Sequence, residues 1–194
     1  MVKKAVNLLE GTNALKVLKY LCENSGKDFT GSAVQKPLGI SRAGVFLAMR
    51  QLIREGFVKN ETRGNTGIYS AEGSNPAVKQ FKILMNIVEL KGVVEKLGPH
   101  MISATLYGSC ARGEDMADSD MDIFIISHDP DRVREILKKI KLKRKIQAVI
   151  KTPVETADFK QKEALYSREV ERGIIVWENK DEHRVWGVSE KRQD

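Results

Sequence analysis

The chain has 194 residues, of which 41% are hydrophobic and 30% charged, a composition typical of a globular protein with one or two small domains. This balance excludes collagen-like, disulfide-scaffold and wholly disordered chains, and no apolar run reaches the roughly 18–20 residues of a membrane-spanning helix. The net charge of +7 lies entirely within residues 1–98, because residues 99–194 carry equal numbers of acidic and basic side chains. This asymmetry predicts a nucleic-acid partner for the first half.

The two cysteines, Cys22 and Cys110, are too few for a disulfide framework and wrongly spaced for a zinc site. The first residues lack the long apolar stretch and the small-residue cleavage site of a secretory signal. We therefore expect a cytoplasmic protein without a membrane partner.

Residues 12–56 predict three helices. The first covers Thr12–Glu23, and the second begins near Thr30 and stops around Pro37, where proline breaks a helix. The third follows Ser41, a good N-cap, and ends at Gly56. Its inward stripe consists of four apolar residues, Val45, Ala48, Met49 and Leu52.

After the third helix, Phe57–Glu61 and Gly67–Ala71 predict two short strands around the turn Thr62–Asn65. Three helices and a hairpin resemble the winged helix-turn-helix domains of prokaryotic regulators. The resemblance covers about residues 8–72 and implies binding to double-stranded DNA, with the third helix in the major groove. The implied contacts to bases and phosphates come from Arg42, Ala43, Phe46 and Arg50 on that helix, and from Lys59 and Arg63 on the hairpin.

Some winged helices dock proteins instead of DNA, and this alternative stays open. Phe46 and Leu47 are unusually apolar for a surface that faces a groove. We favour DNA binding because the location of the positive charge and the fold pattern agree.

Asn75 and Pro76 mark the start of a connecting helix that continues to Gly98. Its apolar residues form two stripes: a heptad seam of Ile83, Ile87, Leu90, Val94 and Leu97, and a second stripe of Val78, Phe81, Met85 and Val88. A helix that is apolar on two sides must bury both. Either both stripes pack within the chain, or one pairs with a second copy, and we favour a homodimer through residues 76–97.

The most informative stretch is GSCARGEDMADSDMDIFIIS, residues 108–127, which follows a short apolar strand at residues 102–107. Gly108 and Ser109 lie where a strand turns into a helix, so that backbone N–H groups can hold phosphate oxygens. Asp120 and Asp122 open the next strand, where alternate side chains project from one face. Two carboxylates on one face suit Mg²⁺, which takes one or two carboxylates plus substrate phosphates. This arrangement predicts phosphoryl or nucleotidyl transfer.

The elements Gly108-Ser109, Ala111-Arg112-Gly113 and Ser119–Asp122 resemble the pattern GSxARG…SDxD of the minimal nucleotidyltransferases, within the DNA polymerase β-like superfamily. The resemblance extends loosely over residues 100–178. It implies that Gly108, Ser109 and Arg112 belong to the nucleotide-binding loop, with Arg112 bracing the loop or a carboxylate such as Asp118. It also implies that the catalytic Asp120 and Asp122 hold Mg²⁺, and that a nucleoside monophosphate passes from a nucleoside triphosphate, ATP being expected, to an acceptor hydroxyl.

The chain departs from this family at one position. Active members supply a third carboxylate from the next strand, which here is Lys145–Ile150 after a helix over Pro130–Lys141, and the position maps to Gln147. Glutamine is neutral and cannot take a proton from the acceptor. Glu155 is close in sequence, but Thr152–Glu155 forms a capping box that gives it a structural role. The nearby Glu114, Asp115 and Asp118 are interpreted as solvated loop charges.

The expected fold class is mixed α/β (α+β). It comprises a winged helix-turn-helix domain at residues 1–74, a connecting helix at 75–98, a small mixed-sheet nucleotidyltransferase domain at 99–180 and a charged tail at 181–194. Two functions remain open: an Mg²⁺-dependent nucleotidyltransferase coupled to DNA binding, and a transcription regulator whose degenerate domain only senses a nucleotide. Small nucleotidyltransferases of this family often modify a HEPN-type RNase, so a HEPN-type protein is a further partner by analogy.

Overall fold

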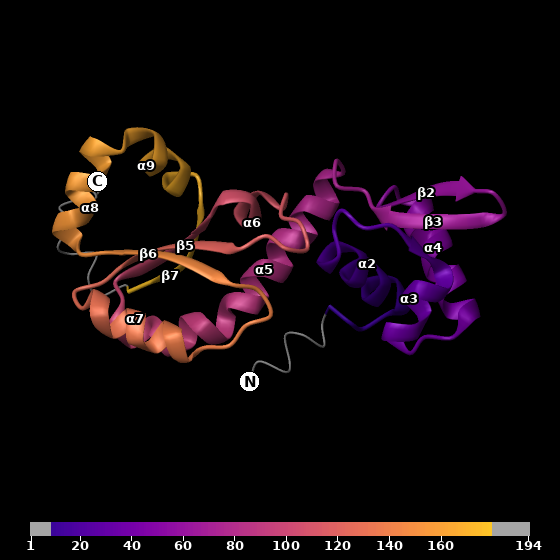
Figure 1. The fold of residues 1–194 in the computed structure, drawn as a ribbon, viewed down its shortest axis with the longest axis horizontal. Coiled ribbons are helices and arrows are strands. Elements are labelled where there is room, and N and C mark those ends of the chain that lie inside the picture. Colours follow the sequence, from indigo (N-terminus) through magenta and orange to yellow (C-terminus); the bar gives the residue numbers. More distant parts are fainter. Residues whose placement is uncertain (1–8, 180–194) are drawn as a thin grey trace, which may run out of the picture. The chain divides into compact units, whose positions relative to one another are not determined.

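The computed structural model describes residues 9–179, apart from the side chain of Lys160, and divides the chain into two compact units (Figure 1). The first unit comprises the residues up to Lys91 together with Ser109–Asp120, and the second comprises Gly92–Gly108 and the residues from Met121 onward. Helices and sheets of both kinds give the predicted mixed α/β architecture. The predicted tail at residues 181–194 lies outside the described residues. None of the described helices is long and apolar enough to cross a membrane.

The first unit begins with three helices, α2 (Asn13–Glu23), α3 (Gly31–Leu38) and α4 (Arg42–Arg54). Each starts after a hydroxyl N-cap: the side chains of Thr12, Thr30 and Ser41 accept a bond from the backbone N–H three residues later, at 3.1–3.2 Å. The predicted helices are therefore confirmed. The second extends one residue beyond Pro37, because proline is tolerated in this last turn before Gly39.

A three-stranded antiparallel sheet completes this part of the unit, in the order β1-β3-β2. β2 (Val58–Arg63) and β3 (Thr66–Ala71) are longer than predicted, because the turn between them contains only Gly64 and Asn65. The φ of Gly64 is +60°, a conformation that glycine adopts without strain. β1 (Phe29–Thr30), which pairs with β3, was not predicted.

The inward stripe of α4 was predicted correctly, since all four of its residues are buried in the core. They pack with apolar side chains of α2 and α3, and Val78 of the following helix joins the same cluster. The cluster contains Val17, Leu18, Leu21, Cys22, Val34, Ile40, Val45, Ala48, Met49, Leu52, Val58 and Val78.

The connecting helix α5 (Pro76–Leu97) begins where predicted, with Asn75 Oδ1 accepting from the backbone N–H of Ala77 at 2.8 Å. Its buried face agrees with the predicted stripes only in part, since Leu90, Val94 and Leu97 of the seam and Val78 of the second stripe are buried. Ile83 and Ile87 of the heptad seam are only half-buried, whereas Lys82 and Asn86 are 4% and 3% exposed. A buried lysine and asparagine require polar partners, which the loop at residues 109–120 supplies.

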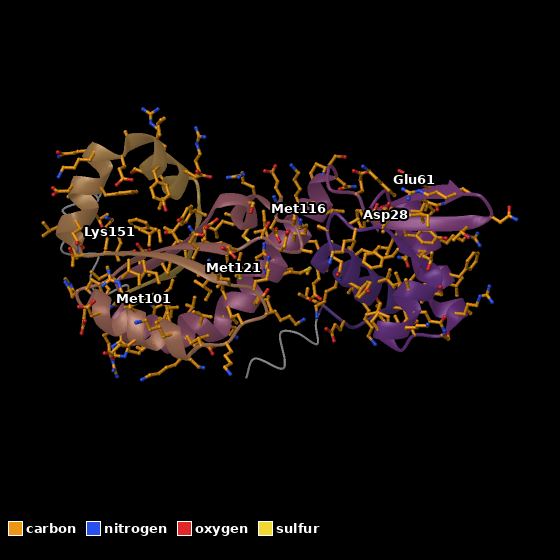
Figure 2. All side chains as sticks on the ribbon, viewed as in Figure 1. Asp28, Glu61, Met101, Met116, Met121 and Lys151 are labelled. Carbon is orange, nitrogen blue, oxygen red and sulfur yellow. The ribbon has the colours of Figure 1, made fainter. Side chains whose placement is uncertain are left out.

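The second unit contains a four-stranded mixed sheet in the order β6-β5-β4-β7, after a short 3₁₀ helix at Gly98–His100. β4 (Ser103–Tyr107) pairs antiparallel with β5 (Met121–Ile126) and with β7 (Ile174–Glu178). β6 (Ile146–Lys151) runs parallel to β5. The start of β5, marked by Met121, and the end of β6, marked by Lys151, lie at opposite ends of the sheet (Figure 2).

Helices cover both faces of this sheet (Figure 1). α8 (Pro153–Lys162) and α9 (Ala164–Glu171) lie on one side, and α7 (Pro130–Lys139) lies on the other. α7 ends two residues earlier than predicted. The capping box at the start of α8 is confirmed in both directions: Glu155 N donates to Thr152 Oγ1 at 3.2 Å, and Thr152 N donates to Glu155 Oε2 at 2.7 Å. Glu155 therefore has the structural role that the sequence predicted.

Candidate functional site

Gly108 stands at the junction of β4 and the short helix α6 (Gly108–Arg112), where the sequence predicted a turn from strand to helix. Its φ is +69°, which favours glycine, and the side chain of Asp122 lies directly against it. A Cβ atom placed on Gly108 would lie 2.6 Å from Asp122 Oδ2. The glycine therefore lets the Asp122 carboxylate rest against the backbone at the head of α6.

Replacing Gly108 with alanine is expected to destabilise the protein more than the same change at Gly64. Both glycines have φ near +60–70°, but a Cβ on Gly64 meets nothing within 4 Å. Gly64→Ala therefore measures backbone strain alone, about 1–2 kcal/mol, whereas Gly108→Ala adds a collision with Asp122. Urea unfolding of both variants measures the difference, and equal losses would show that Asp122 does not rest on Gly108.

Three side chains form a row across the second sheet at this end. Asp122 on β5 pairs in register with Tyr107 on β4 and with Gln147 on β6. Because residues opposite each other in neighbouring strands project from the same face, all three lie on the face that α8 and α9 cover. Tyr107 is buried, Asp122 is half-buried and Gln147 is exposed. Gln147 thus occupies the neighbouring-strand position to which the third carboxylate of the resembling family maps.

Asp120 lies one residue before β5, which begins at Met121. The prediction that both aspartates lie on the strand is therefore right for Asp122 and wrong for Asp120. Asp120 belongs to the first unit, and its backbone carbonyl accepts a weak bond from Cys110 Sγ at 3.4 Å. The two units thus divide the motif, with Ser109, Arg112 and Asp120 in the first unit and Gly108 and Asp122 in the second.

Arg112 braces the loop through a different carboxylate from the predicted Asp118. Its Nε donates to Glu114 Oε2 at 3.1 Å, and Lys79 of α5 donates to the other oxygen of Glu114 at 2.7 Å. The bond from Lys79, followed by that from Arg112, holds the pKa of Glu114 below its ordinary value. Glu114 therefore links the motif loop to α5 by hydrogen bonds and is not a free loop charge.

Asp115 was also predicted as a solvated charge, and this is wrong, because the residue is 5% exposed. Its Oδ1 accepts from Asn86 Nδ2 at 3.2 Å and lies 3.7 Å from Lys82 Nζ. The Lys82 ammonium also donates to the Asp115 backbone carbonyl. Sequence reasoning missed this buried cluster, and the one local signal was the four-residue spacing of Val78, Lys82, Asn86 and Leu90 on one side of α5.

An aromatic cluster adjoins Asp122 on the same face of the sheet. Tyr107 and Tyr166 share a hydrogen bond between their hydroxyls, and Phe124 and Phe159 pack beside them. Burial, followed by the bond to Tyr166, raises the pKa of Tyr107 far above its ordinary value. Burial and the bond to Tyr166 therefore both favour the neutral form of the Tyr107 hydroxyl.

Of the predicted DNA contacts on α4, Arg42, Ala43, Phe46 and Arg50 are all exposed, on the side opposite the buried stripe. On the hairpin, both basic residues face acidic partners. Lys59 Nζ lies 3.4 Å from Glu72, and Arg63 forms ion pairs with Asp28 at 2.9 Å and with Glu61 at 3.4 Å. Figure 2 shows Asp28 close to the hairpin strand that carries Glu61. On α4, Arg54 pairs with Glu55, whereas Arg42 and Arg50 form no ion pair with an acidic side chain of the described residues.

The second unit offers two oxygen donors of the kind that Mg²⁺ prefers, the Asp122 carboxylate and, in register with it, the Gln147 amide oxygen. Asp120 supplies a further carboxylate within the first unit. Within residues 9–179, no group of three or more histidine, cysteine or acidic side chains comes together. Such a site suits a cation that takes its remaining ligands from water and from a nucleotide.

Residues 89–182 match the family model described as "Polymerase beta, Nucleotidyltransferase". The matched range contains the whole motif from Gly108 to Asp122, together with Gln147. No curated protein and no solved structure matches the chain. This part of the chain is therefore similar to the nucleotidyltransferase superfamily, and the match supports a function of the nucleotidyltransferase type.

Proposed function

We propose that the protein is an Mg²⁺-dependent nucleotidyltransferase that transfers a nucleoside monophosphate from a nucleoside triphosphate, ATP being expected, to an acceptor hydroxyl. The observation that carries this proposal is the Asp122 carboxylate, which rests against the positive-φ Gly108 within a matched nucleotidyltransferase range. In this proposal, Asp122 is a metal ligand beside a phosphate-binding turn.

Each motif residue has a role in this proposal. The backbone of Gly108 and Ser109, with the Ser109 hydroxyl, would donate to the triphosphate, and Asp120 and Asp122 would hold the cation. Bound Mg²⁺ would neutralise the charge of the phosphates and of the departing pyrophosphate. Arg112, which is tied to Glu114, would keep the loop in place. In the transfer, the acceptor oxygen bonds to the α-phosphorus, the bond from that phosphorus to the pyrophosphate oxygen breaks, and the acceptor proton leaves to a base.

Calorimetric titration of Mg²⁺·ATP into the full chain tests this proposal without knowledge of the acceptor. Binding that requires Mg²⁺ supports it, and the other nucleoside triphosphates reveal the preferred base. The absence of binding by any Mg²⁺·nucleoside triphosphate would contradict it.

A second candidate function is favoured by Gln147. Its neutral amide, in register with Asp122, can neither accept the proton of the acceptor nor add charge for a second cation. In this alternative, the domain only binds a nucleotide, and the protein is a transcription regulator that senses it. Pyrophosphate release by the wild type separates the two functions, because only an enzyme that turns over produces it.

We further propose that the first unit binds double-stranded DNA as a winged helix. Its element order of three helices and a hairpin, with the additional strand β1, supports this, as does the exposed side of α4. We expect Arg42→Ala with Arg50→Ala to weaken specific binding at least about a hundredfold, since each good base contact contributes about 1–3 kcal/mol. A site selected from random DNA and measured by fluorescence anisotropy provides the test.

Arg54→Ala is the matched control for this prediction. Arg54 also lies on α4 but is 74% exposed in its side chain and pairs with the neighbouring Glu55 at 3.1 Å. Its replacement should leave specific affinity unchanged. Equal effects of Arg54→Ala and of the double variant would contradict the assignment of the exposed α4 surface to the groove.

A further inference from the structure

The buried face of α5 is polar in its middle, although its ends are apolar. Val78 and Leu90 are 1% and 0% exposed, and between them, at four-residue steps, lie Lys82 and Asn86. A charged amine and an amide are costly to remove from water unless they are fully paired. Apolar side chains at these two positions would bury the helix face without this desolvation cost. The polar pair therefore indicates that the protein needs specific hydrogen bonds at this place.

Both side chains of this pair bond to the motif loop, residues 109–120. Lys82 Nζ donates to the Asp115 carbonyl and lies 3.7 Å from its carboxylate. Asn86 Nδ2 donates to the Cys110 carbonyl at 2.9 Å and to Asp115 Oδ1 at 3.2 Å. One helix therefore holds the loop both near its start and at its middle.

Two glycines allow the same loop to lie close to its neighbours in the first unit. A Cβ atom on Gly113 would lie 2.2 Å from the Lys79 carbonyl oxygen of α5, so the loop backbone lies directly on the helix. A Cβ atom on Gly26, just after α2, would lie 2.3 Å from Met116 Cε, and Ala117 N donates to the Ser25 carbonyl at 3.4 Å. The loop is thus docked on two elements of the unit that carries α4.

The loop is also closed on itself. Glu114 N donates to the Ser109 carbonyl at 2.9 Å, Cys110 Sγ donates to the Asp120 carbonyl at 3.4 Å, and Met116 N donates to Ser119 Oγ at 2.8 Å. These bonds involve the backbone of both functional ends, Ser109 and Asp120. Whatever fixes the middle of the loop therefore also fixes the residues proposed to hold phosphate and metal.

We propose that Lys82 and Asn86 are positioning residues for the nucleotide site, and that they act by fixing the motif loop through Asp115 and the Cys110 carbonyl. This inference rests on the function proposed above and deepens it. If it holds, the ability of Ser109 and Asp120 to bind phosphate and metal depends on contacts within the helical unit that also carries α4.

The two cysteines of the chain provide a readout of loop position that needs no nucleotide. Cys110 lies within the loop and is 0% exposed, and Cys22 lies in the core of the same unit and is 3% exposed. Burial raises the pKa of the Cys22 thiol to about 12, and the charges of Lys82 and Asp115 also act on it, so each thiol of a variant is compared with the same thiol of the wild type. Alkylation of each thiol, followed by mass spectrometry, therefore separates opening of the loop from opening of the whole unit.

Lys82→Met retains the length of the side chain and removes its ammonium group. We expect it to speed alkylation of Cys110 at least about tenfold relative to Cys110 of the wild type, without speeding that of Cys22, and to weaken Mg²⁺·ATP binding about 10–100-fold, the range typical of residues that orient ligands. Lys96→Met is the matched control, because Lys96 lies on the same helix and is exposed. It should change neither quantity.

The double variant Lys82→Met/Asp115→Asn distinguishes a positioning role of Lys82 from a role in stability alone. It removes both buried charges, so neither remains unpaired. We expect it to recover resistance to urea relative to Lys82→Met, since no lone carboxylate remains, but not to recover nucleotide affinity, because the Asp115 carbonyl still lacks its donor. If affinity recovers together with stability, the positioning role is overturned. Should Lys82→Met fail to fold, Lys79→Met removes the exposed tie to Glu114 and must give the same changes, smaller in size.

Failure of the proposed function gives a different pattern from failure of this inference. A wild type that binds no Mg²⁺·nucleotide overturns the proposed function and the positioning role with it, whatever the thiols show. A wild type that binds nucleotide, with Lys82→Met unchanged in both affinity and Cys110 alkylation, overturns the inference alone.

Discussion

Asp122→Asn is expected to lower the affinity for Mg²⁺·ATP by at least about a hundredfold, and Asp120→Asn with Asp122→Asn should abolish metal-dependent binding. Loss of a group that merely orients a metal ligand typically lowers metal affinity 10–100-fold, so loss of the ligand itself should have no smaller effect. Asparagine keeps the shape of the side chain, so the contact with Gly108 is retained while the charge is lost. Calorimetry with and without Mg²⁺ measures the change.

Asp118→Asn is the matched control for this result. Asp118 lies in the same loop, two residues before Asp120, and is exposed. Its replacement removes the same charge from the same segment and should leave binding unchanged. If Asp118→Asn and Asp122→Asn weaken binding equally, the effect comes from the general charge of the loop, and the assignment of Asp122 as a metal ligand is wrong.

The second large effect is an expected gain of activity in the variant Gln147→Glu. Gln147→Glu replaces a neutral amide by a carboxylate of the same shape, in register with Asp122. We expect it to allow a second divalent ion in the nucleotide complex, and to raise pyrophosphate release from ATP, with water as acceptor, by about 10²–10⁴-fold, the usual contribution of a positioned base. The Mn²⁺ stoichiometry measured by electron paramagnetic resonance and a pyrophosphate assay give the two readouts.

Gln161→Glu makes the same chemical change on α8, where the side chain is exposed, and serves as the control. It should alter neither readout. Unchanged Mn²⁺ stoichiometry and turnover in Gln147→Glu would show that the row formed by Tyr107, Asp122 and Gln147 is not where the chemistry of this protein takes place.

The parts of the fold that depend on local chemistry could be predicted from the sequence. Ser41 caps α4, Asn75 caps α5, and Thr152 and Glu155 form the expected capping box, because each depends on residues within one turn. The position of Gln147 beside Asp122 could also be anticipated, because an apolar strand was expected to follow a helix there.

The parts that depend on distant partners could not be predicted. β1 has two residues and exists only through its pairing with β3, about 40 residues away. Asp115 was assigned to the surface because charged residues are almost never fully buried unless they are paired, and its partner Lys82 lies 33 residues away. For the same reason the heptad pattern of α5 did not predict the burial of Lys82 and Asn86, although Leu90, Val94 and Leu97 of that pattern are buried.

A crystal structure of the full chain with Mn²⁺ and a non-hydrolysable ATP analogue tests whether the motif from Gly108 to Asp122 binds a metal–nucleotide complex. We expect an anomalous Mn²⁺ peak coordinated by Asp120 and Asp122, with the triphosphate on the backbone of Gly108 and Ser109. Nucleotide bound elsewhere in the molecule, or Mn²⁺ coordinated by neither aspartate, would contradict it.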